Sequence, residues 1–296
     1  MRRPALAALA VAALLPLSAC SPGGPVSPPS PPASAPEPTA SSTDPATDPA
    51  TDPATGPAAG QRWVPAPGTT WQWQLTGDLD LTVDAQVYDV DWQTPRAVVD
   101  RLHEQGRRVV CYVSVGTVED FRDDAAAFPA GVVGEALPDW PDERWLDVRR
   151  LDVLGPLLRA RFDACRDAGF DAVEPDNVDA YANDSGFPLT ADDQLRFNRW
   201  VAAEVRARGM SVGLKNDLDQ VADLVGDFDF AVNESCRVYD ECAALQPFVD
   251  AGKAVLHVEY VEDVSEEEFL AEPAAPGFSS VLKDGDLSAW RVLPRG

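Results

Sequence analysis

The sequence predicts an α/β domain built as a (β/α)8, TIM-like barrel, preceded by a disordered tether rich in proline, alanine and threonine. From Gln61 onward, short β-rich runs alternate with amphipathic stretches, which is typical of successive right-handed βαβ units in a parallel sheet. This region of roughly 235 residues has the usual size of one such barrel. It also lacks a glycine-rich nucleotide loop, which disfavours the competing doubly wound sheet.

The first residues predict export. Met1-Arg2-Arg3 is basic, an apolar run from Ala5 to Leu17 follows, and the run ends in Leu17-Ser18-Ala19-Cys20. This order is typical of a secretory signal peptide, here residues 1–19, and its last residues resemble a bacterial lipobox. We therefore expect lipidation of Cys20 and a cell-membrane lipoprotein that faces the extracellular side. Ordinary cleavage that leaves Cys20 free is the alternative.

Residues 20–60 form the predicted tether. They are rich in Pro, Ala, Ser and Thr, and they include near-repeats that begin at Thr43, Thr47 and Thr51. Because this segment has no aromatic residue, it cannot bury enough apolar surface to offset the entropy of ordering. We expect a lipid-anchored linker that lifts the remaining domain, residues 61–296, off the membrane.

The domain contains nine candidate strands, one more than a barrel needs. They are Trp71–Leu75, Ala85–Tyr88, Arg108–Val113, Trp145–Val148, Ala172–Glu174, Ser211–Leu214, Phe228–Val232, Ala254–Val258 and Ser279–Leu282. Four helices are expected between them, at Thr94–Gln105, Gly155–Ala168, Ala191–Arg208 and Glu241–Ala251, each followed by a glycine. In the first helix, Thr94 is the expected N-cap and Pro95 the first helical residue.

The composition is strongly acidic, with a formal net charge of −25. Such a surface repels nucleic acid and anionic membranes and attracts cations. A cationic substrate would fit, although acidity that serves only solubility is an alternative. We expect a monomer that contacts the membrane only through its lipid anchor and does not bind nucleic acid.

Apart from the lipobox cysteine, the chain has four cysteines, an even number that predicts two disulfides in an oxidising compartment. Three pairings are possible; proximity favours Cys236–Cys242, which leaves Cys111–Cys165. The chain has no CxxC motif and only two histidines, so we expect neither a metal ion nor a cofactor.

Polar and acidic residues follow almost every apolar run. These candidate site residues are Asp89, Asp91, Tyr112, Asp147, Glu174, Asp176, Asn177, Asp179, Tyr181, Lys215, Asn216, Asp217, Glu234, Glu259 and Tyr260. In a (β/α) barrel, active sites are built at the carboxyl ends of the strands. One acid in such a place is more often a helix cap or turn residue, but that explanation is strained when it must cover six strand ends. A ring of carboxylates therefore predicts chemistry.

Several classes of chemistry lack their motifs in this chain. HExxH, a P-loop and a dinucleotide fingerprint are all absent from the sequence. Paired carboxylates remain, and these cleave glycosidic bonds: one donates a proton to the leaving oxygen, and the other attacks the anomeric carbon or activates water. Tyr112, Tyr181 and Tyr260 would offer stacking faces to sugar rings, although ordinary packing explains any one of them.

Six segments resemble glycoside hydrolase family 114, whose founding activity is endo-α-1,4-polygalactosaminidase. They are Tyr88–Asp91, Val110–Gly116, Trp145–Arg149, Gly169–Asp179, Gly213–Asn216 and Asn233–Cys236. The resemblance spans nearly all of the domain. It implies a barrel, secretion, and cleavage of α-1,4-linked galactosamine-containing polymers without a redox cofactor. It points to Asp176 and Glu234 as the catalytic carboxylates.

On this basis Asp176 is expected to be the nucleophile and Glu234 the general acid/base of a retaining mechanism. Other acids of the ring would bind the ammonium groups of the substrate. Glu174 stands where many relatives are expected to have an aliphatic residue; it would bind an amine or raise the pKa of its neighbour. Lys215 would pair with an acid and orient it, and a Cys236–Cys242 loop would stiffen the segment after Glu234.

Two other functions stay open. One is a carbohydrate-binding surface lipoprotein whose barrel has lost turnover, although the presence of both Asp176 and Glu234 argues against it. The other is a hydrolase of a different α-linked glycan, such as a partly acetylated one. The sequence leaves acetylation preference, cleavage mode and stereochemical outcome open.

Overall fold

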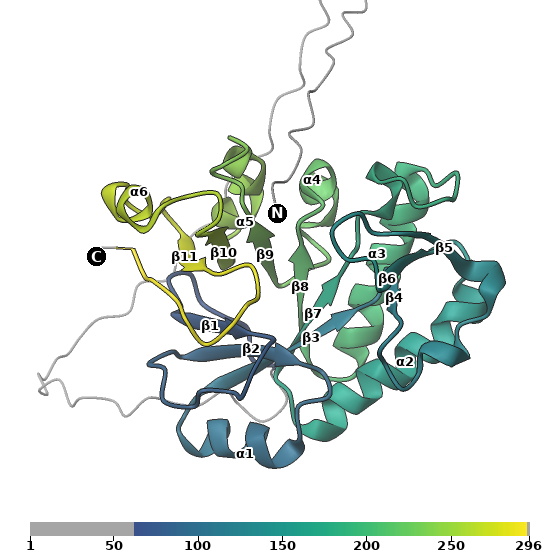
Figure 1. Cartoon of the computed structure of the whole chain (residues 1–296), viewed down its shortest axis with the longest axis horizontal. Coiled ribbons are helices and arrows are strands. Elements are labelled where there is room, and N and C mark those ends of the chain that lie inside the picture. The colour runs from purple at the N-terminus through teal and green to yellow at the C-terminus, as the bar shows by residue number, and fades with distance from the viewer. Residues whose placement is uncertain (1–61, 295–296) are drawn as a thin grey trace, which may run out of the picture. The chain divides into compact units, whose positions relative to one another are not determined.

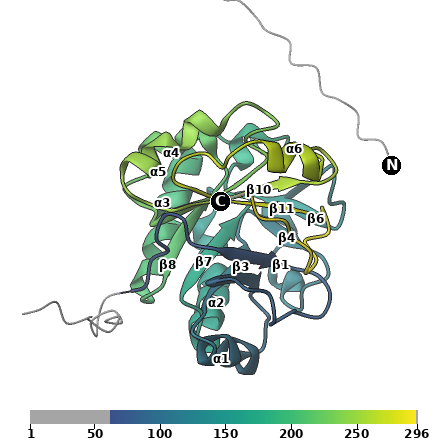
Figure 2. The same ribbon diagram turned by 90° about the vertical axis from the view of Figure 1, so that its left-hand side faces the viewer.

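A computed structural model describes residues 62–294. The predicted signal peptide, the tether and Cys20 lie outside the described residues. Eight parallel strands follow one another in the order β1-β2-β3-β7-β8-β9-β10-β11, and the helices lie around the outside of these strands (Figures 1 and 2). The strands form a nearly closed barrel, so the predicted (β/α)8 class is confirmed. Between residues 62 and 294, no helix is long and apolar enough to cross a membrane.

The barrel strands are β1 (Trp71–Gln74), β2 (Val87–Asp91), β3 (Arg108–Ser114), β7 (Ala172–Asp176), β8 (Ser211–Lys215), β9 (Phe230–Glu234), β10 (Val255–Tyr260) and β11 (Phe278–Lys283). The α-helices are α1 (Arg96–Glu104), α2 (Leu151–Ala168), α3 (Ala191–Ala207), α4 (Val221–Leu224), α5 (Gln246–Asp250) and α6 (Glu266–Ala271). Short 3-10 turns cover Ala125–Ala127, Ala130–Val132, Ala180–Ala182, Leu218–Gln220 and Cys242–Leu245.

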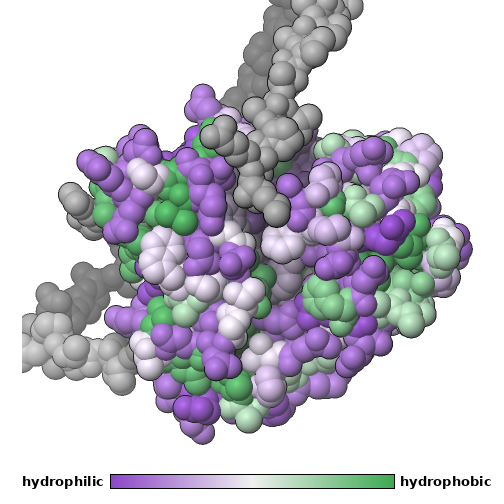
Figure 3. Space-filling model, viewed as in Figure 1, coloured by the Kyte–Doolittle hydropathy of each residue, from purple (hydrophilic) through white to green (hydrophobic). Residues whose placement is uncertain are grey.

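The alternation of side chains along each strand produces two apolar layers. One layer fills the barrel and includes Trp71, Trp73 and Val110. The other lies between the strands and the helices, and it includes Cys111 and Phe162. Both layers are almost free of solvent contact, so the strands present fixed carboxyl ends to the mouth of the barrel. On the face in Figure 3, hydrophilic side chains predominate and hydrophobic ones form small separate groups.

One of the nine predicted strands, Trp145–Val148, is not part of the barrel. β6 (Glu143–Leu146) pairs antiparallel with β4 (Thr117–Glu119) and β5 (Val133–Ala136) in a separate three-stranded sheet. All three strands belong to the connection between β3 and α2. The expectation of a barrel strand at Trp145–Val148 is therefore wrong; its apolar side chains are buried because this small sheet packs against the barrel.

The segment after β11 lies along both end strands of the sheet. The backbone N–H of Leu75, just after β1, donates to the carbonyl of Leu287 at 2.9 Å, and Leu282 of β11 forms an antiparallel bridge with Val292. The indole N–H of Trp71 also reaches across to the carbonyl of Ser279 at 2.7 Å. These bonds join the two ends of the sheet.

The helix ends differ from the prediction in detail. Pro95 caps α1 without a side-chain bond, so Thr94 is not its N-cap. α2 starts earlier than predicted, at Leu151, and contains Pro156. The stretch expected as one helix at Glu241–Ala251 divides into a 3-10 turn and α5. The predicted glycine stop of α2 holds, because Gly169 follows the helix with φ of 92°.

Two disulfides tie these elements together. Cys111 of β3 is bonded to Cys165 of α2, 54 residues later in the chain. Cys236 is bonded to Cys242 and closes a short loop directly after β9. Both predicted pairings are confirmed: Cys236–Cys242, which proximity along the chain favoured, and Cys111–Cys165, which was left by exclusion.

Candidate active site

The ammonium group of Lys215, at the end of β8, is surrounded by three carboxylates. Its Nζ lies 2.9 Å from Glu174, 3.0 Å from Asp176 and 3.3 Å from Glu234. The side chain is only 2% exposed and rests 4.6 Å from the ring centre of Trp73. Burial by itself would lower the pKa of Lys215, but the three acids outweigh burial and raise that pKa well above its usual range. Lys215 is therefore a fixed cation that gathers acids from two neighbouring strands.

Asp176, the last residue of β7, has a donor on each carboxylate oxygen. The hydroxyl of Tyr112 donates to Oδ2 at 2.8 Å. Oδ1 accepts from Lys215 at 3.0 Å and from the backbone N–H of Asn177 at 2.8 Å. These bonds hold the carboxylate in one orientation, with 17% of the side chain exposed.

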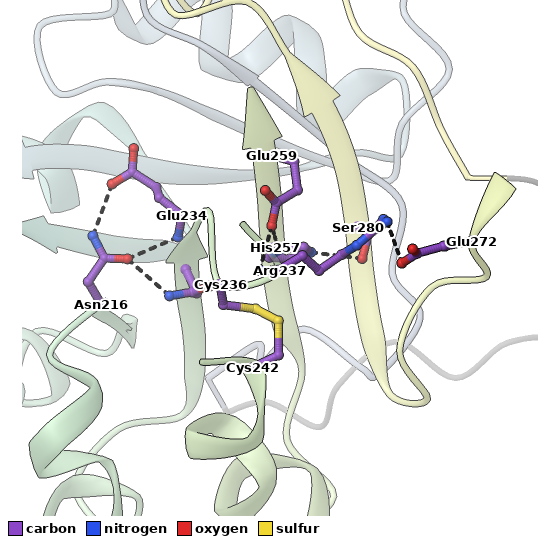
Figure 4. The surroundings of a disulfide bond; sticks show 10 residues. Asn216, Glu234, Cys236, Arg237, Cys242, His257, Glu259, Glu272 and Ser280 are labelled. Carbon is purple, nitrogen blue, oxygen red and sulfur yellow. Dashed lines mark hydrogen bonds and ion pairs between the residues drawn. A yellow bond between two sulfur atoms is a disulfide. The ribbon is translucent and has the colours of Figure 1, made fainter. Parts of the chain in front are cut away.

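Glu234, the last residue of β9, is held by both neighbouring strands. The Nδ2 of Asn216 donates to its Oε2 at 3.0 Å, and the hydroxyl of Tyr260 donates to its Oε1. The Oδ1 of Asn216 also accepts the backbone N–H of Glu234 at 2.9 Å (Figure 4). One asparagine therefore fixes both the backbone and the carboxylate of Glu234, whose side chain is 28% exposed.

The shared lysine limits the distance between the two exposed acids. An oxygen of Asp176 and an oxygen of Glu234 both contact the Nζ of Lys215, at 3.0 Å and 3.3 Å. These oxygens cannot be further apart than the sum of those two distances. For these two oxygens, the limit is compatible with the about 5–5.5 Å that separates the carboxyl groups of retaining glycosidases.

Strands β7, β8 and β9 all end in the same way. The last residue of each strand belongs to the cluster, and the next residue has a left-handed backbone, with φ of 61° at Asn177, 45° at Asn216 and 60° at Ser235. Such a conformation costs about 1–2 kcal/mol in a residue with a side chain, and asparagine tolerates it better than most. The chain therefore turns sharply after each functional residue, which leaves its side chain at the mouth.

The loop after β3 supports Asp176 from behind. The backbone N–H groups of Val115 and Gly116 donate to the carbonyl of Asp176 at 3.1 Å and 3.2 Å. A Cβ atom on Gly116 would lie 1.6 Å from the carbonyl oxygen of Asn177. Glycine is therefore the residue that lets the two segments approach so closely.

Three further acids lie beside the cluster with strongly raised pKa values. Burial, followed by the charge of Asp179, raises the pKa of Asp217 to about 8. Burial and the charge of Asp176 raise that of Asp179 to about 6. Burial raises that of Glu143 to about 7, although a hydrogen bond from the Thr117 hydroxyl opposes it. Within residues 62–294, none of these three acids forms an ion pair. No cationic side chain of the described residues therefore neutralises them when they are ionised.

Several predicted residues are therefore brought together by the fold. Tyr112, Glu174, Asp176, Asn177, Lys215, Asn216, Glu234 and Tyr260 form the cluster; Asp89 lies beneath it, and Asp179, Tyr181 and Asp217 adjoin it. Tyr181 joins this group through its hydroxyl, which donates to Asp217 at 3.3 Å.

Two predicted acids are instead used within the structure. Arg122 donates to both oxygens of Asp91, at 3.0 Å and 2.5 Å. Arg149 does the same to Asp147, at 2.7 Å and 2.8 Å. Because their acceptors are filled by arginine, Asp91 and Asp147 do not join the cluster, which corrects the expectation of one continuous ring.

Glu259 is also outside the cluster, because its side chain points away from the barrel interior. It is fully buried, and its Oε1 accepts from the Nε2 of His257 at 2.7 Å and from the backbone N–H of Arg237 at 2.9 Å. Figure 4 shows these contacts beside the disulfide that follows Glu234. Glu259 thus anchors the disulfide loop and is not placed to contact a substrate.

Sequence reasoning did not identify Glu143, Trp73 or Gly116 as site residues. Glu143 comes from the small antiparallel sheet and follows no barrel strand, so the strand-end argument does not reach it. Trp73 looks like an ordinary apolar strand residue. For Gly116 a signal existed, since it is the glycine of the Val110–Gly116 segment that carries the family resemblance.

Comparisons with known proteins agree with this geometry. The sequence profile of glycoside-hydrolase family GH114 matches residues 52–296. The structure is similar to that of Ega3 from Aspergillus fumigatus in complex with galactosamine, with 35% identity, a TM-score of 0.75 and coverage of 79% of this chain and 98% of that one. The glycoside hydrolase domain of PelA from Pseudomonas aeruginosa shares the fold, with 14% identity, a TM-score of 0.60 and coverage of 77% and 99%. An uncharacterised protein of Deinococcus radiodurans is 26% identical over 223 residues, which are 67% of this chain and 70% of that protein.

Proposed function

This chain belongs to glycoside-hydrolase family GH114 and is a glycosidase, and on that premise we propose that it cleaves α-1,4 linkages within a galactosamine-containing polysaccharide outside the cell. The observation that carries the proposal is the pair of partly exposed carboxylates, Asp176 and Glu234, which share contact with the buried ammonium group of Lys215.

We propose a retaining reaction in two steps. In the first, an Asp176 oxygen attacks the anomeric carbon while Glu234 gives its proton to the glycosidic oxygen, which leaves as a hydroxyl of the departing sugar. In the second, Glu234 takes a proton from water, and the resulting hydroxide displaces Asp176 from the anomeric carbon. The contact of both acids with one ammonium group supports this route, because a retaining pair must be close together.

Each neighbour of the pair has a part in this scheme. The hydroxyl of Tyr112 and the ammonium of Lys215 hold Asp176 in line for attack. Tyr260 and Asn216 keep Glu234 close to the leaving oxygen through both of its carboxylate oxygens. Since these donors are already in place before substrate binds, little reorganisation is needed in the transition state.

The unmatched acids beside the cluster support a cationic substrate. Asp179, Asp217 and Glu143 have raised pKa values because burial and neighbouring negative charges disfavour ionisation. An ammonium group on a sugar would supply the missing positive charge and form charge-assisted hydrogen bonds with them. The similarity to Ega3, whose structure was solved in complex with galactosamine, supports the same choice of sugar.

Export and anchoring are proposed from the sequence. The basic start, the apolar run and the small residues before Cys20 favour a lipid-anchored form, and residues 20–60 would carry a monomeric domain away from the membrane.

The test is incubation of the purified chain from residue 21 onward with α-1,4-galactosamine oligomers, followed by mass spectrometry. Shorter oligomers are expected from the wild type. The isosteric variants Asp176→Asn and Glu234→Gln should lose at least about a thousandfold in kcat while keeping the wild-type unfolding temperature. Fully N-acetylated oligomers of the same length are the control for charge, and they should be cleaved more slowly.

The product configuration tests the stereochemistry, since an α-configured reducing end at first release indicates retention. A folded wild type that leaves every oligomer intact would favour a binding role or another glycan, and a glycan array would distinguish these. Full activity in either carboxylate variant would exclude the proposed pair.

A further inference from the structure

Beneath the cluster lies a second pair of acids that the two-step reaction does not use. Asp89 of β2 and Glu174 of β7 are both fully buried. Along their strands they follow Val87 and Ala172 at a spacing of two, and both of those side chains lie in the barrel interior. Asp89 and Glu174 therefore project into the barrel, directly under Lys215.

The hydrogen-bonding groups around this pair do not match two ionised acids. None of the four carboxyl oxygens accepts a hydrogen bond from a hydroxyl, an amide or a backbone N–H within the described chain. The one cation in contact is Lys215, whose Nζ lies 2.9 Å from Oε1 of Glu174 and is shared with Asp176 and Glu234. Two adjacent buried carboxylates with so few donors are strongly unfavourable unless they share a proton.

A proton on Asp89 resolves this mismatch. The carboxyl group of Asp89 then donates to the carboxylate of Glu174. Burial, together with the negative charge of Glu174, raises the pKa of Asp89 well above its usual range. Glu174 is more easily ionised than Asp89 because Lys215 is in direct contact with it.

We propose that Asp89 and Glu174 form a proton-sharing carboxyl pair in which neutral Asp89 orients ionised Glu174, and Glu174 holds Lys215 in place beneath the two catalytic carboxylates. This inference rests on the proposed function of Asp176 and Glu234. In it, Glu174 and Asp89 are positioning residues, since neither reaches the mouth of the barrel.

Other titratable groups near Asp89 and Glu174 lie on the barrel strands from β3 to β10. Asp176 of β7, Lys215 of β8 and Tyr260 of β10 interact with the pair. Tyr112 of β3 is the register partner of Glu174, and Glu234 of β9 contacts the same Lys215. With Asp89 neutral, Lys215 faces three acids instead of four. Glu174 then adds one fixed negative charge under the catalytic pair, which makes both catalytic acids harder to ionise.

The test compares the same chemical change at the two positions. Glu174→Gln removes the fixed charge and frees Lys215, so kcat should fall at least about tenfold and both limbs of the pH–rate profile should move to lower pH. Asp89→Asn replaces one neutral donor by another, since the amide N–H still points at Glu174. Both limbs should therefore stay where they are, whatever the change in kcat.

Glu174→Asp keeps the charge and serves as the second variant if Glu174→Gln does not fold. Its shorter side chain should lower kcat without moving the limbs. Limbs that move equally in Asp89→Asn and Glu174→Gln would overturn the proposal, because Asp89 would then carry a charge. Unmoved limbs in Glu174→Gln would also overturn it, because the charge of Glu174 would then have no part in the reaction.

A measurement without substrate separates this proposal from the proposed function. The infrared difference spectrum between wild type and Asp89→Asn at neutral pH should show the carbonyl stretch of a protonated carboxylic acid in the wild type alone. If the galactosamine oligomers are not cleaved but this band is present, the function is wrong and the shared proton stands. If they are cleaved and the band is missing, the function stands and the shared proton is excluded.

Discussion

Lys215 and Arg122 each gather acids in the loops and strand ends at the mouth of the barrel, but the two clusters differ in how completely their charges are matched. Arg122 donates two bonds to Asp91, at 3.0 Å and 2.5 Å, and two to Glu119, both at 2.8 Å. Every carboxylate oxygen in that group has a donor, because the planar guanidinium fits two carboxylates side by side.

The Lys215 cluster has more acceptors than donors. One ammonium group contacts Glu174, Asp176 and Glu234, and Asp89 lies next to them without a donor of its own. The comparison teaches that a cluster of acids at a strand end is not by itself a sign of catalysis. In the Arg122 group, one guanidinium satisfies both acids completely, whereas in the Lys215 cluster one ammonium group is divided among three carboxylates, and the oxygens of the buried acids Asp89 and Glu174 lack other donors.

The largest expected effect comes from removing each cation in turn. Lys215→Met should lower kcat at least about a thousandfold, because it leaves three carboxylates without their common cation. Arg122→Met should destabilise the fold by about 3–5 kcal/mol, the usual result of breaking a buried ion pair, while kcat of the folded fraction falls less than about tenfold. Oligomer cleavage and urea unfolding measure both. Similar losses of kcat in the two variants would contradict the view that the Lys215 cluster serves catalysis and the Arg122 group serves the structure.

A smaller effect is expected from the close approach behind Asp176. Gly116→Ala forces apart two segments that would otherwise overlap at 1.6 Å, so the Asp176–Asn177 turn must move and kcat should fall about a hundredfold, or about 2.7 kcal/mol. Gly131→Ala is the matched control, because nothing lies within 4 Å of its added Cβ. It should change neither kcat nor stability by more than about 0.5 kcal/mol. Equal behaviour of the two variants would show that the turn is not held by this contact.

The smallest expected effect is on stability. The contributions of two buried aspartates, Asp217 and Asp229, change with pH in opposite directions. The pKa of Asp217 is raised to about 8, so the folded protein keeps a proton that the unfolded chain loses, and this group lowers stability as pH rises from about 4 to 8. For Asp229, burial acts to raise the pKa, but hydrogen bonds from Arg62 and Arg206 outweigh it and the pKa is lowered. Its contribution to stability is present above about pH 4 and is lost as pH falls through its folded-state pKa.

Replacing each by asparagine should therefore shift stability in opposite directions. Between about pH 5 and about pH 7.5, Asp217→Asn should gain on the order of 2 kcal/mol relative to wild type. Asp229→Asn should be less stable than wild type over that whole range, with the deficit disappearing only below about pH 4. Urea unfolding at several pH values measures both. A pH-independent difference for Asp217→Asn would mean that its acid is ionised in the folded protein, like that of Asp229.

The barrel was predictable because its strands and helices leave clear marks in the sequence. Apolar runs such as Ala172–Glu174 are followed by capped helices such as α3, and this alternation is what a closed parallel sheet requires. The fourth predicted run, Trp145–Val148, is also apolar, but its first residues belong to β6 in a separate antiparallel sheet. Apolar content predicts burial, and it does not tell which neighbour a strand will pair with.

The site was predictable as a region but not in its details. The resemblance pointed to Asp176 and Glu234, which the fold brings to the same lysine, and the position of Lys215 at a strand end predicted its pairing with an acid. The sequence could not show that Asp91 stays outside the cluster, because that depends on Arg122, which reaches Asp91 across 31 residues of chain. It also could not reveal Glu143, which reaches the cluster through the fold of a loop.

The Cys111–Cys165 disulfide has a consequence for the survival of this protein under proteolysis. It spans 54 residues, and the entire small sheet with Glu143 and Arg122 lies between its two cysteines. If a protease cuts the chain anywhere in that connection, the barrel strand β3 and the helix α2 remain covalently joined. A nicked molecule would therefore keep both fragments until the bond is reduced, which is useful for an enzyme proposed to work outside the cell, where damaged copies cannot be replaced in place.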